Sequence, residues 1–373
     1  MNFPEVVLLD APSSLGIQVV HCLHLDGFRR LTTVSGEVRS RLRFSRCCRH
    51  VLLPGWDWTS GPEALSRKVA IPEGALILPM TTSAIRWCVR HQEALLARWR
   101  LTPLPEGKGL EQVIDKVTLG EVGLGAGLRT PRTLRLGDHD PKEMDGFLRE
   151  VGFPLLLKPV RGSGGIGIHE VRDRGELRPH RIVVGGGEGY CLQEFVTGED
   201  VSCGLVAREG KVVAQVAYVP LTRRDRFGTF RSLRAVEDPA VESAVVRLVA
   251  GLKWSGPASL DFRRAQGGGV WLLDFNPRPW GNMRSLLGTG VNFPGLLCRM
   301  ALGEVPRVER LLPVEYVSPV DALRRIVGAH PWGGAKLDVA IGVRRGGWSF
   351  VVRDPGLYAA MGFLTVWDRL RGN

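Results

Sequence analysis

The chain has few residues of several kinds, and these shortages narrow the class of protein. Only 8 of its 50 basic residues are lysines, and it contains only five asparagines. It has no apolar run of about eighteen residues, so no transmembrane helix is expected. Glu5 and Asp10 lie where a secretory signal would carry basic residues. The seven cysteines form no CxxC pair and the eight histidines no HxH or HExxH pattern. We expect a cytoplasmic protein with reduced thiols and no zinc site.

The net charge of +12 raises the question of a nucleic-acid partner. The arginines are spread over all segments, and no RNA-binding, zinc-finger or basic-zipper signature is present, so we expect neither a nucleic-acid nor a membrane partner. The densest basic cluster comprises Arg223, Arg224, Arg226, Arg231 and Arg234. It is either a solvated basic loop or a place where guanidinium groups grip the carboxylate or phosphate of a small substrate.

Length and patterning predict a large core in two or three lobes. Residues 1–105 alternate apolar strand runs with helical or irregular segments, which predicts a parallel α/β layer. The runs are Val6–Asp10, Leu31–Val34, Val51–Leu53 and Ala75–Pro79. Leu101–Gly109 is the clearest linker. Residues 106–305 carry the motifs described below. Residues 306–373 are expected to pack on the core as an extension, with possible elements at Pro319–Val327, Trp348–Arg353 and Tyr358–Arg371.

Two carboxylates and one amide follow each other closely in the segment Ser259–Gly281. Asp261 and Asp274 lie in strand-like runs, Ala258–Phe262 and Val270–Phe275, and the glycine-rich stretch between them predicts a hairpin turn. Strand side chains alternate, so Asp274 and Asn276 share a face, and the hairpin can bring Asp261 to it. Oxygen ligands of this kind suit Mg²⁺. The alternative is a surface hairpin with ordinary polar edges.

A glycine-rich loop follows a strand that ends in a lysine. The strand pattern Phe153–Pro159 contains Lys158 and leads into the loop Arg161–Gly167, which includes Gly162, Ser163, Gly164 and Gly165. Glycines let backbone N–H groups approach a phosphate, although flexible surface loops look similar. No Gly-Lys-Ser/Thr ends this loop, so it is not a Walker A loop. A strand at Gly167–Val171, rather than a helix, is expected to follow, so it is not a dinucleotide fingerprint.

A third segment, Cys191–Ser202, has the pattern of a strand, a tight turn and a second strand. An extended backbone with free N–H and C=O groups can pair with a purine edge. Asp200 can accept hydrogen bonds from ribose hydroxyls. The alternative is a plain β-turn with acidic solubilising residues.

Taken in this order and spacing, these motifs resemble the ATP-grasp superfamily of carboxylate–amine ligases over residues 110 to 305. Asn276-Pro277-Arg278, Trp280-Gly281 and the later Gly290–Pro294 look most like its carbamoyl-phosphate-synthase-like branch. The resemblance implies an α/β fold, α+β in the grasp lobes, in which a Rossmann-like domain precedes the ATP-grasp domain. It also implies ATP and Mg²⁺, or Mn²⁺, as cofactors.

The resemblance assigns roles to individual residues. The residues that contact ATP would be Lys116, Lys158, Arg161, Gly162, Ser163, Gly164, Gly165, Gln193, Glu194, Phe195, Val196 and Asp200. Asp261, Asp274 and Asn276 would hold one or two metal ions. Lys158 and Arg278 would stabilise the phosphoryl group in transfer, and the candidate substrate contacts are Arg223, Arg224 and Arg284. The family usually has Glu where this chain has Asp274, which is one methylene shorter and places bridging of two metals in question.

The resemblance also implies a reaction. A substrate carboxylate would attack the γ-phosphoryl group of ATP, and an amine would capture the acyl phosphate to give an amide, ADP and phosphate. Small acids and amines are therefore the expected partners. Related ligases are often dimers, so a homodimer is also expected. Two alternatives remain: an enzyme that activates bicarbonate, and an ATP-binding regulatory module without catalysis.

Overall fold

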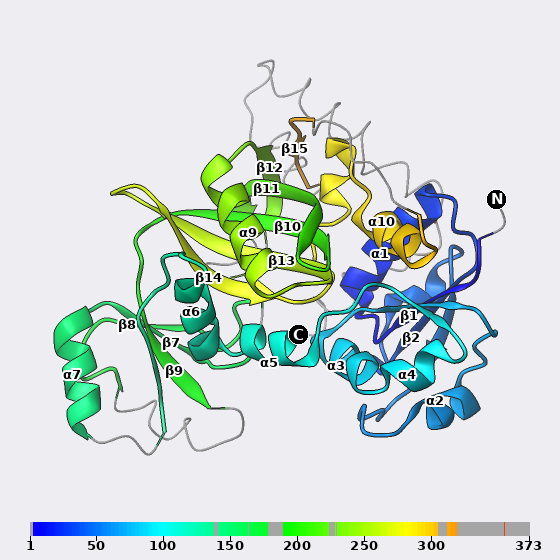
Figure 1. The fold of residues 1–373 in the computed structure, drawn as a ribbon, viewed down its shortest axis with the longest axis horizontal. Helices are drawn as coiled ribbons and strands as arrows, with labels where there is room; N and C mark the ends of the chain where they lie inside the picture. Colours follow the sequence, from blue (N-terminus) through cyan, green and yellow to red (C-terminus); the bar gives the residue numbers. More distant parts are fainter. Residues whose placement is uncertain are drawn as a thin grey trace, which may run out of the picture.

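The computed structural model describes residues 3–137, 141–162, 164–177, 189–223, 228, 230–304, 312–318 and 354. Within them the chain forms three sheets, each in its own part of the molecule (Figure 1). The amino-terminal part lies on one side, a large lobe occupies the middle and a small lobe the other side. Predicted elements at Pro319–Val327, Trp348–Arg353 and Tyr358–Arg371 lie outside the described residues.

The amino-terminal part is a parallel five-stranded sheet with the order β3-β2-β1-β4-β5. Its central strand, Val-Val-Leu-Leu, is fully buried, as expected of a parallel strand covered on both faces. The strands are β1 (Val6–Leu9), β2 (Leu31–Ser35), β3 (Arg49–Leu52), β4 (Leu76–Pro79) and β5 (Arg100–Leu101). The helical elements are α1 (Ser13–Leu25), η1 (Arg41–Phe44), α2 (Pro62–Lys68), α3 (Thr82–Arg90) and α4 (Gln92–Leu96). The predicted parallel α/β layer is confirmed.

Two short helices connect this sheet to the rest of the chain. The predicted linker begins in the last residue of β5 and ends inside α5 (Gly107–Ile114), so only its middle is without regular structure. Asp115 caps the next helix, α6 (Lys116–Gly125), by accepting from the backbone N–H groups of Val117 and Thr118. The cap fixes where α6 begins, and it makes Lys116 the first residue of the helix.

The small lobe is a four-stranded antiparallel sheet with the order β6-β9-β7-β8 and one helix, α7 (Pro141–Val151). Its strands are β6 (Thr133–Arg135), β7 (Leu155–Pro159), β8 (His169–Val171) and β9 (Tyr190–Glu194). Leu148 of α7 packs with Leu155, Leu157 and Leu192 of the sheet in a small core. This core holds β7 in place, and with it Lys158 near the strand's end.

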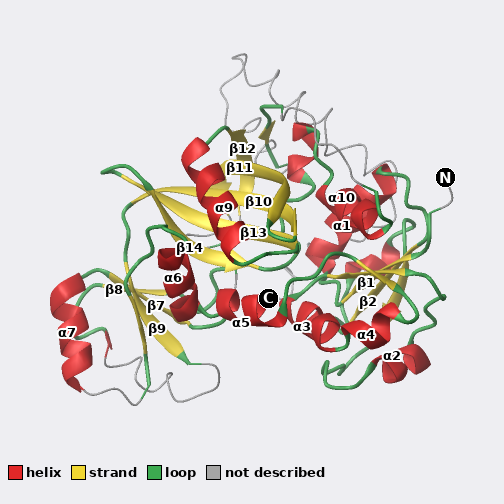
Figure 2. Cartoon of the chain, viewed as in Figure 1, coloured by secondary structure: helices red, strands yellow, loops and turns green. Residues whose placement is uncertain are grey.

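The large lobe is a six-stranded antiparallel sheet with the order β14-β13-β10-β11-β12-β15. Its strands are β10 (Gly198–Arg208), β11 (Lys211–Arg223), β12 (Phe230–Val236), β13 (Gly256–Ala265), β14 (Val270–Asn276) and β15 (Glu315–Tyr316). Helix α9 (Pro239–Gly251) covers one face (Figure 2). Residues that alternate along β10 and β13, such as Val201, Cys203 and Leu260, pack with α9 in one core. The residues between them therefore face the other side, where the polar groups gather.

The segment after β14 joins the large lobe to the amino-terminal part. It contains η3 (Ser285–Thr289) and α10 (Phe293–Ala301), which lies beside α1. Arg299 of α10 donates to Asp26 over 2.9 Å, and Asn292 donates to the carbonyl of Cys22 over 2.7 Å. One hydrophobic core contains Leu8 and Val20 together with Trp280 and Phe293. The two parts therefore share buried side chains.

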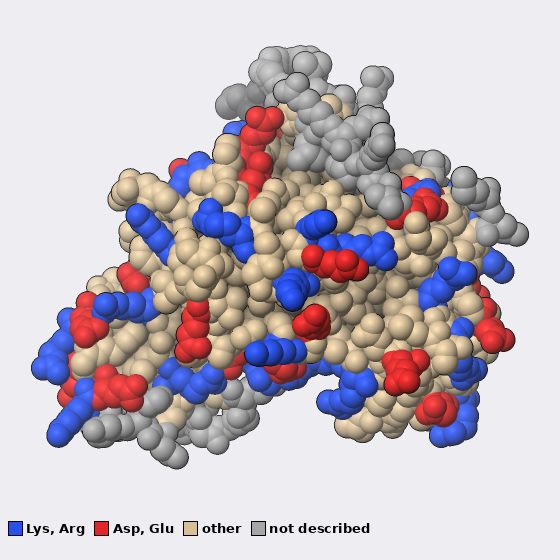
Figure 3. All heavy atoms as spheres, in the orientation of Figure 1, with Lys and Arg blue, Asp and Glu red and all other residues tan. Residues whose placement is uncertain are grey.

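Near the carboxyl end, β15 pairs with β12, and Asp354 is fully buried. Asp354 accepts hydrogen bonds from the backbone N–H of Arg46, over 2.9 Å, and from the hydroxyl of Ser45. In the described part of the chain, no helix has the length and apolar character needed to cross a membrane. On the face shown in Figure 3, acidic and basic side chains are interspersed over all three parts.

Candidate functional site

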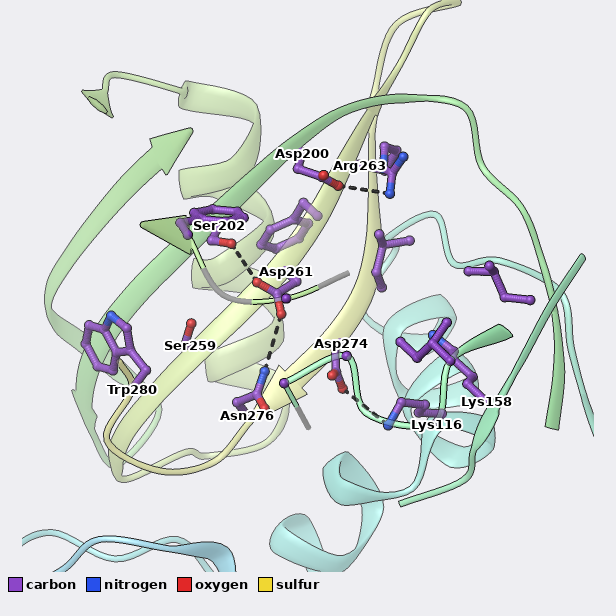
Figure 4. A pocket seen from close by; sticks show the side chains of 18 of the residues that line it. Lys116, Lys158, Asp200, Ser202, Ser259, Asp261, Arg263, Asp274, Asn276 and Trp280 are labelled. Atoms are coloured by element: carbon purple, nitrogen blue, oxygen red, sulfur yellow. Dashed lines mark hydrogen bonds and ion pairs between the residues drawn. The ribbon is translucent and has the colours of Figure 1, made fainter. Parts of the chain in front are cut away.

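A cavity of about 220 Å³ brings most of the predicted site residues together between the two lobes. The small lobe contributes residues of β7, of the glycine-rich loop and of β9, and the large lobe contributes residues of its open face. Figure 4 shows the labelled side chains from close by. The predicted residues that line the cavity are Lys116, Lys158, Gly164, Gly165, Gln193, Glu194, Phe195, Val196, Asp200, Arg223, Asp261, Asp274, Asn276 and Arg278.

The predicted hairpin is confirmed, and it places the two carboxylates side by side. Strands β13 and β14 are antiparallel, with Asp261 opposite Asp274 and Ser259 opposite Asn276. Directly opposite residues project to the same face of a sheet, so all four side chains share one side. The amide nitrogen of Asn276 lies 3.4 Å from Asp261 Oδ2. The register of the pairing between β13 and β14 shifts between Asp261 and Phe262. This irregularity lies directly beside Asp261, which we predicted to bind metal.

The carboxylate of Asp261 lies in a buried position with one close donor. Ser202 Oγ donates to Asp261 Oδ1 over 2.6 Å from the neighbouring strand β10. Burial, and then the negative charge of Asp274, raise the pKa of Asp261 to about 6, although the Ser202 hydrogen bond acts in the opposite direction. Two acidic groups in this environment favour either a proton or a cation between them.

Two lysines with only 4% and 6% of their surface exposed, Lys158 and Lys116, stand opposite these carboxylates. Lys116 Nζ lies 4.0 Å from Asp274 Oδ1 and donates to the carbonyl of Gly162 over 3.1 Å. Burial, together with the positive charge of Lys116, lowers the pKa of Lys158 to about 8, against the pull of Asp274. A buried ammonium group is costly without an anion nearby, so these two lysines favour a phosphate at this end of the cavity.

The glycine-rich loop adopts backbone conformations that require glycine. Gly164, Gly165 and Gly167 have φ values of +72°, +77° and +74°. Strand β8 follows, as predicted, and not a helix. Ser163 lies outside the described residues. Arg161 was expected to contact ATP, but its guanidinium lies 3.5 Å from Glu111 Oε2, and Arg161 and Gly162 are not among the residues that line the cavity.

The segment Cys191–Ser202 differs from its prediction. It was expected to be a strand, a tight turn and a strand, but β9 belongs to the small-lobe sheet and β10 to the large-lobe sheet. Phe195, Val196 and Thr197 therefore connect the lobes and are not the turn of a hairpin. The side chain of Gln193 donates to Thr133 Oγ1 over 2.9 Å. Glu194 accepts from the backbone of Arg132 over 3.1 Å.

Asp200 carries two guanidinium partners. Arg263 lies 2.9 Å from Asp200 Oδ1, and Arg223 forms an ion pair with the other oxygen (Figure 4 shows Arg263). Arg223 also lies over the ring of Phe230, 5.0 Å from its centroid, which orients its guanidinium. Of the predicted basic cluster, Arg223 therefore borders the cavity, whereas Arg224 and Arg226 lie outside the described residues.

The guanidinium of Arg278 lies next to the hairpin. It donates to the carbonyl of Pro279 over 3.0 Å and lies 3.5 Å from Asn276 Oδ1. Burial lowers its pKa, while Asp274 and Asp261 oppose that change. Arg284, which was predicted to contact substrate, is not among the cavity residues and lies 3.3 Å from His21 Nδ1 of α1.

Sequence reasoning missed several cavity residues as functional groups, namely Ser202, Tyr218, Ser259, Arg263, Trp280 and Asn282. Ser259 lies two residues before Asp261, so strand alternation would have found it. Ser202 lies two residues after Asp200, but its position opposite Asp261 depends on the pairing of β10 with β13. Tyr218 of β11 pairs with Ser202 of β10, and no sequence signal indicates this position.

The donor set fits Mg²⁺ better than a transition metal. Among the described residues, no group of three or more His, Cys, Asp or Glu side chains is placed to hold a metal. What is present is two carboxylates and one amide on the same face. Mg²⁺ commonly binds one or two carboxylates and completes its shell with phosphate oxygens and water. Asp261, Asp274 and the amide oxygen of Asn276 therefore fit this ion in the presence of a nucleotide.

Comparison with known proteins gives the fold and a family match over part of the chain. A family model described as ATP-grasp in the biosynthetic pathway with Ter operon matches residues 188–323, which include the hairpin. A D-alanine–D-alanine ligase from Polaromonas naphthalenivorans is 26% identical over 202 residues, which are 49% of this chain and 62% of the ligase. The chain thus spans less than two thirds of this relative.

Solved structures extend the likeness over most of the chain. N5-carboxyaminoimidazole synthetase from Staphylococcus aureus, complexed with ADP, has a TM-score of 0.66 at 13% identity and covers 89% of this chain and 87% of its own. The biotin carboxylase domain of Hydrogenobacter thermophilus 2-oxoglutarate carboxylase, solved with MgADP and bicarbonate, has a TM-score of 0.63 at 18% identity. It covers 83% of this chain and 72% of its own. The expected fold class is confirmed, while the narrower branch stays a prediction. Residues 188–323 are similar to the ATP-grasp family, and the chain shares the fold of these solved structures.

Proposed function

We propose that this protein is an ATP-dependent ligase that activates a substrate carboxylate as an acyl phosphate and couples it to an amine. The observation that carries the proposal is one cavity in which two buried lysines face two carboxylates, an amide and a guanidinium. The lysines suit the phosphates of a nucleotide, and the acidic side suits its metal ion. The relationship to a D-alanine–D-alanine ligase supports the same reaction class.

In the nucleotide complex, the adenine is expected to lie against the connection Gln193–Val196, where Leu156 and Ile168 also line the cavity. Lys116 and Lys158 then meet the phosphates, and the glycine-rich loop supplies backbone N–H groups. Asp200 is the expected partner of the ribose. Because Asp200 holds Arg223 and Arg263 in this structure, the ribose would have to share or replace these partners.

Asp261, Asp274 and Asn276 would hold Mg²⁺, which would neutralise negative charge on the phosphates. A substrate carboxylate oxygen forms a bond to the γ-phosphorus, and the bond from that phosphorus to the β,γ-bridging oxygen breaks, releasing ADP. The carboxylate is already a competent nucleophile, so no base is needed for this step. Lys116, Lys158 and Arg278 hold positive charge around the oxygens of the group in transfer.

In the second step the amine nitrogen attacks the carbonyl carbon of the acyl phosphate. The carbon–oxygen bond to the phosphate breaks, inorganic phosphate leaves, and the nitrogen loses a proton. Water would hydrolyse the acyl phosphate, so its enclosure between the two lobes protects it until the amine reacts. The guanidinium of Arg278 lies beside Asn276, where it stabilises the departing phosphate.

Two other functions can be tested against this proposal. The solved biotin carboxylase complex contains bicarbonate, so activation of bicarbonate to carboxyphosphate is the second candidate. A regulatory module without catalysis would keep nucleotide binding and lose turnover. The intact set of Asp261, Asp274, Asn276 and Arg278 argues against such a module.

Hydroxylamine provides the direct test, because it captures acyl phosphates as hydroxamates whatever the natural amine is. The enzyme is incubated with MgATP, hydroxylamine and each acid of a panel of amino acids, dipeptides and bicarbonate. Phosphate and hydroxamate are then measured. The proposal expects both products with at least one organic acid, and their loss in Asp274→Asn. Phosphate release with bicarbonate alone would favour the second candidate. Tight ATP binding without any product would refute the ligase.

We further propose small acids and amines as the partners and the cytoplasm as the location. All seven cysteines are free and six of them are buried, which supports a reducing compartment. The biotin carboxylase neighbour is a dimer, and a homodimer stays a prediction for this chain. Mn²⁺ in place of Mg²⁺ likewise stays a prediction.

A further inference from the structure

We propose that Trp280, seated on Gly204, closes the substrate end of the cavity and limits the ligase to compact substrates. This inference rests on the proposed function, because it assigns the substrate's place in the same cavity. In Figure 4, Trp280 and the two lysines lie at opposite ends, with Asp261 and Asn276 between them. With the phosphates at the lysine end, the group that attacks them must approach from the side of Trp280.

The indole of Trp280 sits where a glycine leaves room for it. A Cβ built on Gly204 of β10 would lie 2.1 Å from Cζ2 and 2.6 Å from Cε2 of the indole. No real Cβ approaches so closely, so any side chain at residue 204 must displace the ring. Gly204 lies opposite Ser259, in the strand register that faces the cavity. The glycine is therefore required for the present position of the indole.

The indole also packs against a second aromatic ring. The ring of Phe293 meets it edge to face, with centroids 4.9 Å apart and planes at 65°. Trp280 has only 4% of its surface exposed, yet it lines the cavity together with Tyr218 and Asn282. The contact with Gly204 and the aromatic contact with Phe293 together hold the indole in place as a large, rigid wall.

The volume of the cavity explains why this wall selects by size. The cavity measures about 220 Å³, below the range of about 300–1,000 Å³ that is usual for small-molecule sites. The proposed function places the adenine, ribose and phosphates of ATP in this same cavity, so little of its volume remains for a substrate. The room left at the Trp280 end suits an acid or amine with a short side chain, and the hydroxyls of Tyr218 and Ser259 and the amide of Asn282 provide polar contacts for it.

The test compares Trp280→Leu with the parent enzyme on glycine, alanine, leucine and phenylalanine, each in both enantiomers where they exist. Hydroxamate formation gives kcat/KM, and a thermal shift in the presence of Mg²⁺ and AMP-PNP gives binding. The parent should prefer the smallest acids. In the variant, the ratio of kcat/KM for leucine or phenylalanine to that for glycine or alanine should rise at least about tenfold. The same ratio in parent and variant, or no response to any acid by either readout, overturns the inference.

A second pair of variants tests the geometry itself. Gly204→Ala should lower the melting temperature and restrict the enzyme to smaller substrates, because the indole of Trp280 is pushed toward the cavity. Adding Trp280→Leu to Gly204→Ala should restore part of both losses, because the clash is gone. Gly251→Ala, whose Cβ meets no atom within 4 Å, is the control for the glycine change. Trp87→Leu, far from the cavity in α3, is the control for the loss of a buried indole. Independent, additive effects of the two changes would contradict the contact.

The two proposals can fail separately. Suppose that no acid gives hydroxamate, yet AMP-PNP-dependent binding is strongest for the smallest acids and this preference changes with Trp280→Leu. The ligase proposal then fails, and the selection of substrates by size stands. If hydroxamate forms, yet Trp280→Leu leaves the size preference unchanged, the ligase stands and the role of Trp280 fails.

Discussion

Ser202 Oγ donates a 2.6 Å hydrogen bond to Asp261 Oδ1, and the two residues lie directly opposite each other on strands β10 and β13. The bond occupies one oxygen of Asp261 and fixes how its carboxylate turns. The second oxygen stays on the side of Asn276, 3.4 Å from its amide nitrogen. A hydrogen-bond donor that orients a metal-binding carboxylate in this way is expected to contribute to metal affinity.

Ser202→Ala should weaken the magnesium-dependent part of nucleotide binding by roughly 10- to 100-fold, because the carboxylate loses its orientation. Calorimetric titration of ADP with Mg²⁺ and with EDTA separates the two contributions. Ser66→Ala, which removes a hydroxyl on the distant helix α2, is the control. An equal loss of affinity with and without Mg²⁺ would show that Ser202 supports the fold and not the metal site.

Nucleotide affinity should fall as the pH rises above about 8, because burial lowers the pKa of Lys158 to about 8 in the free protein. A nearby polyphosphate stabilises the ammonium form and raises this pKa, so ADP binding takes up a proton between the free and bound pKa values. Titrations at pH 7 and pH 9 in two buffers of different ionisation enthalpy measure both effects. Lys158→Gln should bind weakly at both pH values and take up no proton, while the surface variant Lys211→Gln behaves like the parent. Proton release on binding would contradict the assignment.

The sequence predicts those parts of the site that depend on local patterns. The hairpin of Asp261 and Asp274 follows from two apolar runs and a glycine-rich turn, and the loop after Lys158 follows from its glycines. Both are formed as expected. The parallel sheet of residues 1–105 follows in the same way from alternating strand and helix patterns.

What the sequence could not supply depends on which strands become neighbours. Ser202 reaches Asp261 only because β10 pairs with β13, although the two residues are far apart in the chain. Strands β9 and β10 belong to different sheets. Their sequence has the same strand–turn–strand pattern as a hairpin, so the local pattern does not distinguish the two arrangements. Arg161 illustrates a third limit, since its ion pair with Glu111 of α5 depends on how that helix packs against the loop.

Acid should destabilise the protein through His21, a buried residue of α1. Burial, and then the charge of Arg284, lower its pKa to about 4, although Asp354, 3.5 Å from the ring, acts in the opposite direction. The unfolded chain has an ordinary histidine pKa of about 6.5. Between these values the unfolded state binds more protons, so stability falls as the pH falls from about 6.5 to 4, by roughly 3 kcal/mol in total. Urea unfolding at pH 7.5 and pH 5 measures the change.

His21→Gln should lose less stability between these two pH values than the parent does. Comparing the variant with the parent separates the contribution of His21 to the pH dependence from those of other titrating groups, such as His50 and Asp261. Burial also lowers the pKa of His50, which adds to the acid sensitivity. The pKa of Asp261 is raised, so it favours the folded state below its folded pKa and acts in the opposite direction. Equal pH dependence in variant and parent would show that His21 is not the responsible group.

Gly198→Ala should destabilise the protein by about 3 kcal/mol or more, because this residue lies where the chain enters the large lobe and touches the next strand. A Cβ at residue 198 would lie 2.0 Å from the carbonyl oxygen and 2.7 Å from the carbonyl carbon of Arg264, and its φ of +151° is already unfavourable for a side chain. Both neighbours are backbone atoms paired in the sheet, so neither moves without breaking the ladder that also carries Asp261. Urea unfolding measures the loss, and Gly251→Ala, at the end of α9, should be neutral or slightly stabilising. If the two variants unfolded at the same urea concentration, the close contact between β10 and β13 at Arg264 would be wrong, and with it the strand register that brings Ser202 to Asp261.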